Sequence, residues 1–172
     1  MAIAIKPAMT GKKQLGPLGL LPDFVSASAL AQDIVDKIRF LEDFDMERER
    51  KILTAEINDE FLSHVMVREF KRFFSLELLF PDADYPFVPS EEIDPIWHDI
   101  VLDSRRYVGI CEKLYGGYVH HTPVDTCPGE MAQNAGERFG HTKRLLERAF
   151  GGITPSAWGV AAYCNRAACT WP

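Results

Sequence analysis

The feature that most constrains the fold is a long amphipathic run that starts near Asn58 or Asp59 and reaches about Phe80. Its apolar residues recur at the three- and four-residue spacing of one helix face. They are Phe61, Val65, Phe70, Phe73, Phe74 and Leu78. Pro81 follows and cannot continue a helix. The run therefore predicts one long helix with a broad apolar face, typical of the core of a helical domain.

The rest of the chain shows shorter helical segments and no useful strand alternation. Further helices are expected from Ser26 or Ser28 to Asp43, over 45–57, from Asp94 to Leu102, from Asp103 or Ser104 to the Gly116-Gly117 pair, and from about Gly129 to Phe150. Asp94 is the expected N-cap of its helix, because Pro95 then takes the first helical position. The predicted fold is all-α, a compact bundle of about four to six helices with an extended N-terminal arm and a C-terminal tail.

Composition divides the chain into three parts. Residues 1–23 are rich in proline and glycine and predict an extended arm, residues 24–152 form the helical domain, and residues 153–172 form a tail. Trp158 and Trp171 are the expected anchors of that tail. An arm and a tail of this kind predict docking on one or more protein partners.

Charge and hydropathy exclude several classes of function. A net charge of −6 argues against general nucleic-acid binding, and no apolar run is long enough to cross a bilayer. The basic side chains Arg68, Lys71 and Arg72 are interpreted as a solvated helix face, with a nucleic-acid contact as the weaker alternative. The first residues do not resemble a signal peptide, which predicts a cytoplasmic protein or one within an intracellular assembly.

The cysteines are Cys111, Cys127, Cys164 and Cys169. Without a secretion signal, four cysteines in a chain of this size favour free thiols or metal ligands over a disulfide framework. A bond between Cys164 and Cys169 stays open as an alternative.

The segment from Ile96 to Pro123 concentrates the residues that could do chemistry. His98, Cys111 and either His120 or His121 form a candidate nitrogen and sulfur ligand set suited to zinc. Taken singly, each residue has a structural interpretation, as a core histidine or a buried cysteine. Convergence of His98 and Cys111 requires the chain to turn between Leu102 and Ser104.

A catalytic interpretation needs further groups beside the metal. Among the nearby carboxylates, Asp94 and Asp99 are the candidates for a general base, although such residues also serve as helix caps. Cys111 acting as a nucleophile with a histidine base is another alternative.

The stretch VPSEEIDPIWHDIVLDSRRYVGICEKLYGGYVHHTP resembles the central motif of the glycine-rich domain-containing protein-like family. The matching residues are Val88, Pro89, Ser90, Asp94, Trp97, His98, Tyr107, Cys111, Gly116, His120, His121 and Pro123, with weaker matches at Phe139, Thr142, Phe150, Gly151, Pro155 and Trp158. The resemblance covers roughly residues 28–158 and implies a helical domain without assigning a reaction. One departure is Ile100, where the family pattern has a second histidine.

Two hypotheses follow for function. The first is a non-catalytic helical subunit or adaptor of a larger assembly, with the motif as its structural centre and a candidate site for one structural zinc ion. The second is a metal-dependent enzyme of hydrolase or oxygenase type, with His98, Cys111 and His121 as ligands and Asp94 or Asp99 as base. A nucleic-acid-contacting protein is the weaker third alternative.

Overall fold

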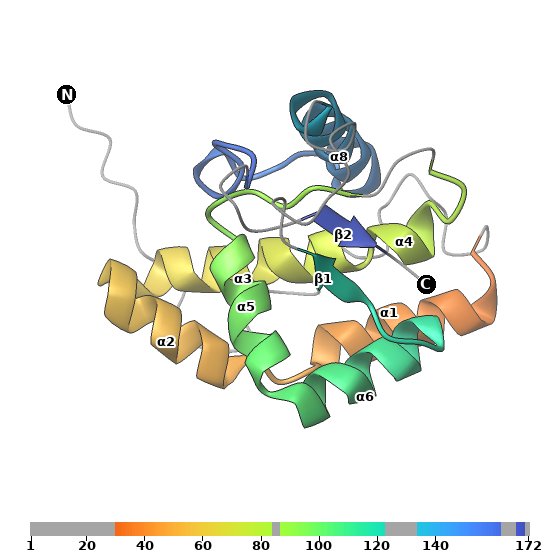
Figure 1. Cartoon of the computed structure of the whole chain (residues 1–172), viewed down its shortest axis with the longest axis horizontal. Coiled ribbons are helices and arrows are strands. Elements are labelled where there is room, and N and C mark those ends of the chain that lie inside the picture. Colours follow the sequence, from red (N-terminus) through yellow and green to blue (C-terminus); the bar gives the residue numbers. More distant parts are fainter. Residues whose placement is uncertain (1–29, 84–86, 123–133, 163–167, 171–172) are drawn as a thin grey trace.

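The computed structural model describes residues 30–83, 87–122, 134–162 and 168–170 (Figure 1). Within these ranges lie seven α-helices, one short 3-10 helix and two short strands. The elements are α1 (Gln32–Asp43), α2 (Glu47–Ile57), α3 (Glu60–Phe74), α4 (Leu76–Leu79), α5 (Asp94–Leu102), α6 (Ser104–Tyr115), β1 (His120–Thr122), α8 (Ala135–Phe150), η3 (Pro155–Ala157) and β2 (Ala168–Thr170). The predicted all-α class is confirmed, with slightly more helices than expected.

Helix α3 lies at the centre of the molecule (Figure 1). Asp59 caps its start, because its side chain accepts a hydrogen bond from the backbone N–H of Leu62. The predicted long helix is interrupted at Ser75, whose hydroxyl donates to the Arg72 carbonyl and separates α3 from α4. Phe61 was predicted to face the core, but it is 57% exposed at the first turn of the helix.

The basic side chains of α3 correct the sequence prediction. Lys71 is buried and donates to two carbonyls at the C-terminal end of α1, those of Glu42 in its last turn and of Phe44 just after it. Arg68 and Arg72 both pair with Glu69, which is fully buried. These three cations are therefore not a solvated face, and they offer no exposed basic surface for a nucleic acid.

Helices α5 and α6 follow the predicted boundary at Asp103, whose side chain caps α6. The predicted N-cap at Asp94 is wrong. Ser90 begins the turn that leads into α5. Its carbonyl accepts a hydrogen bond from the Asp94 N–H, and its hydroxyl accepts one from the Ile93 N–H. Asp94 is thus the first helical residue, and its carboxylate is not used as a cap. Gly116 ends α6 with φ +73°, a left-handed conformation that suits glycine.

Two predicted helix starts differ from the structure. Helix α1 begins at Gln32, after an extended Ala31, and α8 begins at Ala135 rather than near Gly129. Both predicted starts, at Ser26 or Ser28 and at Gly129, lie outside the described residues, as do the arm over residues 1–23 and the anchor Trp171.

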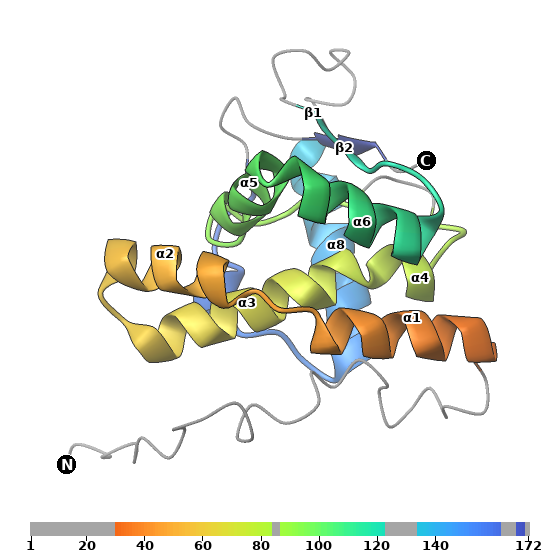
Figure 2. The same cartoon turned by 90° about the horizontal axis from the view of Figure 1, so that it is seen from below.

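The part of the tail that is described packs on the chain's own body. Trp158 is buried, and β2 pairs antiparallel with β1. Helix α8 lies on the other side of α3 from α1 and α6 (Figures 1 and 2). Between these elements, the rings of Trp97, Phe70, Phe73 and Phe74 pack together as the centre of the core. None of the described helices combines the length and apolar composition that crossing a bilayer requires.

Candidate metal centre

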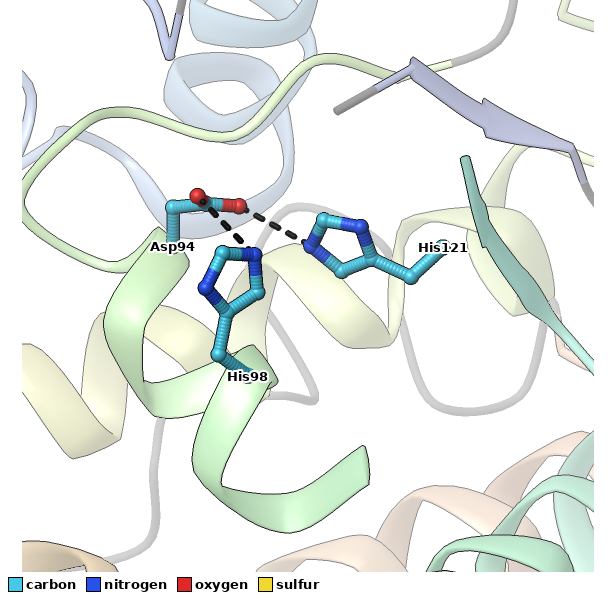
Figure 3. A group of neighbouring side chains, drawn as sticks. All are labelled: Asp94, His98 and His121. Carbon is cyan, nitrogen blue, oxygen red and sulfur yellow. Dashed lines mark hydrogen bonds and ion pairs between the residues drawn. The ribbon is translucent and has the colours of Figure 1, made fainter. Parts of the chain in front are cut away.

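Three side chains meet where α5 passes β1 (Figure 3). Asp94 and His98 are four residues apart in α5, so they lie on the same helix face. His121 comes from the middle of β1, 27 residues further along the chain than Asp94. Nε2 of His121 is 3.0 Å from Oδ1 of Asp94, and Nε2 of His98 is 3.4 Å from Oδ2. One carboxylate is therefore shared by two imidazoles.

The burial of the three residues is unequal. The side chains of Asp94 and His121 are 5% and 6% exposed, whereas that of His98 is 39% exposed. The cluster thus has a buried side, formed by Asp94 and His121, and a solvent-facing side at His98. His98 is therefore the member of the cluster whose imidazole solvent contacts most.

The charge environment of Asp94 is unusual for a buried carboxylate. Burying an ionised carboxylate is costly unless a cation or several hydrogen bonds compensate it. Within the described part of the chain, Asp94 forms ion pairs with the two histidines and with no lysine or arginine. The charge of the buried carboxylate can be offset by a proton on one of the imidazoles or by a bound cation.

The spacing of the ligand atoms fits one metal ion. One nitrogen or oxygen atom from each of the three residues lies within 4.8 Å of the other two. Ligands held at about 2.0–2.1 Å from a tetrahedral zinc ion are about 3.3 Å apart. The separations of the two imidazole nitrogens from the Asp94 carboxylate are close to that value, although each runs to a different oxygen, 3.0 Å to Oδ1 from His121 and 3.4 Å to Oδ2 from His98.

His121 is held by packing as well as by its hydrogen bond. The ring of Trp97 meets the imidazole edge-on, with centroids 4.6 Å apart. The backbone of His121 pairs with Cys169 of β2, which places the last described strand beside the cluster. The imidazoles of His98 and His121 are themselves 4.6 Å apart between centroids. This distance shows that the two candidate ligands do converge.

The structure does not bring the other candidates into the cluster. Cys111 is buried on α6, where burial raises the pKa of its thiol and makes it a poor nucleophile. His120 is exposed and packs its ring against Tyr118. The carboxyl of Asp99 lies outside the group, and burial raises its pKa against the opposing charge of Arg48 on α2.

Sequence reasoning missed the role of Asp94. It was a candidate general base or a helix cap, whereas the structure places it as the group that both histidines share. The signal was present as the four-residue spacing from Asp94 to His98 on one helix face. Ile100, at which the predicted family resemblance would place a second histidine, is fully buried in the apolar core, so the cluster forms without that position.

Comparison with known proteins gives one match. A model of the UCP032817-like family matches residues 32–144, which include α1 to α6, β1 and all three residues of the cluster. No curated protein and no solved structure matches the chain. The resemblance to the glycine-rich domain-containing protein-like family stays a prediction, because this match does not bear on it. The match spans well over half of the sequence, and the chain belongs to the UCP032817-like family.

Proposed function

We propose that this protein is a metal-dependent enzyme of hydrolytic type that binds one zinc ion through Asp94, His98 and His121. The observation that carries the proposal is the buried Asp94 carboxylate, shared between Nε2 of His98 and Nε2 of His121. Two imidazoles and one carboxylate form a donor set that suits zinc, and ferrous iron is the alternative ion for the same set.

Protons take the place of the ion in the absence of metal. A neutral histidine can donate Nε2–H to Asp94, and zinc binding requires that nitrogen to lose its proton. Loading the site therefore releases protons and neutralises the buried carboxylate. The affinity for zinc is expected to fall as the pH is lowered, because protons compete for the imidazole nitrogens.

The unequal burial favours catalysis over a purely structural ion. Structural zinc sites usually have four protein ligands, whereas catalytic sites have three and leave a position for water or substrate. Zinc in such a site lowers the pKa of a bound water to about 7, which supplies a nucleophile for hydrolysis. The described residues offer three ligands, and the open position would lie on the His98 side, where the imidazole is 39% exposed.

The hypothesis of a non-catalytic assembly subunit competes with this proposal. It depends on the arm over residues 1–23, which lies outside the described residues. In the described part of the tail, β2 pairs with β1 of the same chain. Docking on a protein partner remains a prediction that does not require the cluster.

The test is a zinc titration by calorimetry, followed by hydrolysis assays with nitrophenyl acetate, nitrophenyl phosphate and bis-nitrophenyl phosphate. We expect one zinc per chain and turnover of at least one ester, abolished by chelator and restored by zinc. Asp94→Asn and His121→Ala should lose zinc binding and ester turnover. His120→Ala, which alters the exposed neighbour of His121, should keep zinc binding and turnover. Zinc affinity unchanged in Asp94→Asn would refute the site, and tight zinc binding without turnover of any ester would refute the hydrolytic role.

A further inference from the structure

The proposed function needs α5 and β1 to keep a fixed spacing, because Asp94 and His98 come from one and His121 from the other. Helix α6 lies between them in the sequence and packs against α5. The side chain that joins all three elements is Tyr107 of α6, which is fully buried.

The Tyr107 hydroxyl makes two hydrogen bonds. It accepts from Nε1–H of Trp97 on α5 at 2.9 Å and donates to the Val119 carbonyl at 2.7 Å. Val119 is also fully buried and immediately precedes β1. The hydroxyl thus ties the helix of two candidate ligands to the residue that leads into the strand of the third.

Both ends of this connection are close to the cluster. Trp97 precedes His98 in α5, and its ring packs edge-on against His121 at 4.6 Å. Val119 lies two residues before His121. The Val119 carbonyl is therefore tied to α6 through the Tyr107 hydroxyl, which limits how far the start of β1 can shift relative to α6.

We propose that Tyr107 is a positioning residue of the metal centre, which sets the place of His121 relative to Asp94 and His98 through Trp97 and Val119. This inference rests on the proposed function. Tyr107 does not touch the ion, and it acts by holding the ligands at the spacing that the ion requires. Residues that orient metal ligands in this indirect way typically change metal affinity by roughly 10- to 100-fold when mutated.

The chain offers a matched control on the same helix. Tyr115, two turns after Tyr107, also donates its hydroxyl to a backbone carbonyl, that of Phe74. Its partner belongs to α3 and not to β1. Tyr107→Phe and Tyr115→Phe each remove one hydroxyl from one tyrosine of α6, but only the first cuts the connection to β1.

The experiment compares zinc affinity and the visible spectrum of the cobalt-substituted protein in the wild type and both variants. Tyr107→Phe should weaken zinc binding by roughly 10- to 100-fold and shift or weaken the cobalt bands, which report ligand geometry. Tyr115→Phe should change affinity by less than about threefold. Zinc affinity of Tyr107→Phe within that threefold range, or equal losses in both variants, would overturn the inference.

A metal-free readout separates this inference from the proposed function. Imidazole ¹⁵N spectra at a single pH report which nitrogen of His121 carries the proton. Tyr107→Phe should change the His121 signals, and Tyr115→Phe should not. If the wild type binds no zinc but Tyr107→Phe alters His121, the proposed function fails and the positioning role stands. Unchanged His121 signals in Tyr107→Phe overturn the positioning role whatever the zinc result.

Discussion

Glu69 gives the sharpest prediction about what holds this fold together. Its carboxylate is fully buried and accepts from Arg68 Nη2 at 3.1 Å, Arg72 Nη1 at 3.0 Å, Thr154 Oγ1 at 3.1 Å and Trp158 Nε1 at 3.0 Å. It therefore connects α3 to the segment that follows α8. Glu69→Ala would leave two largely buried guanidinium groups and an indole N–H without this acceptor. Removing one partner of such a buried network costs about 3–5 kcal/mol.

That loss is large beside a typical domain stability of about 5–15 kcal/mol. For a chain of this size it should lower the melting temperature by about 6–20 °C. Calorimetry and urea unfolding would measure the change, with Glu60→Ala as the control. The Glu60 side chain is 72% exposed where it pairs with Arg50, and its removal should cost less than about 1 kcal/mol. Similar losses in the two variants, both below about 1 kcal/mol, would refute the assigned role of Glu69.

Three further predictions concern the cluster, the tail and pH. Zinc at a free concentration of about 100 times its dissociation constant should stabilise the wild type by about 2.7 kcal/mol, seen as a thermal shift that Asp94→Asn lacks; an equal shift in both would count against the site. Truncation after Ala162 removes β2, the pairing partner of β1, and should weaken zinc binding several-fold; unchanged affinity would show that β2 does not support His121. Burial lowers the pKa of Lys71 from 10.5 to about 8 in the folded protein, against the opposing charges of Asp43 and Asp45. The unfolded chain then binds more protons between those two values, so this lysine makes stability rise with pH across that window, and urea titrations of Lys71→Met should lack that part of the slope.

The helices were largely predictable from the sequence because apolar spacing reports which face of a helix is buried. Helix α3, the cap at Asp59 and the glycine ends of α6 and α8 follow directly from such local signals. The burial of polar side chains on the opposite face of α3 could not be predicted from these signals. Lys71 was assigned to solvent because spacing alone does not show that two carbonyls at the end of α1 lie within its reach.

The cluster was only partly predictable for the same reason. Convergence of His98 with one histidine of the His120-His121 pair was foreseen, but the choice between the pair was not. Neighbouring residues in a strand point to opposite faces, and a strand of three residues is too short to show its pattern in sequence. The part played by Asp94 depends on a strand 27 residues away, which no local pattern reveals.

The most direct test of the central claim is the metal content of untagged protein purified without chelator, measured by elemental mass spectrometry. Wild type, His98→Ala, His121→Ala and His120→Ala should be compared. We expect about one zinc ion per chain in the wild type and in His120→Ala, and loss of that zinc in His98→Ala and His121→Ala. Equal metal content in His120→Ala and His121→Ala, or no metal in the wild type even after zinc is added, would contradict the central claim.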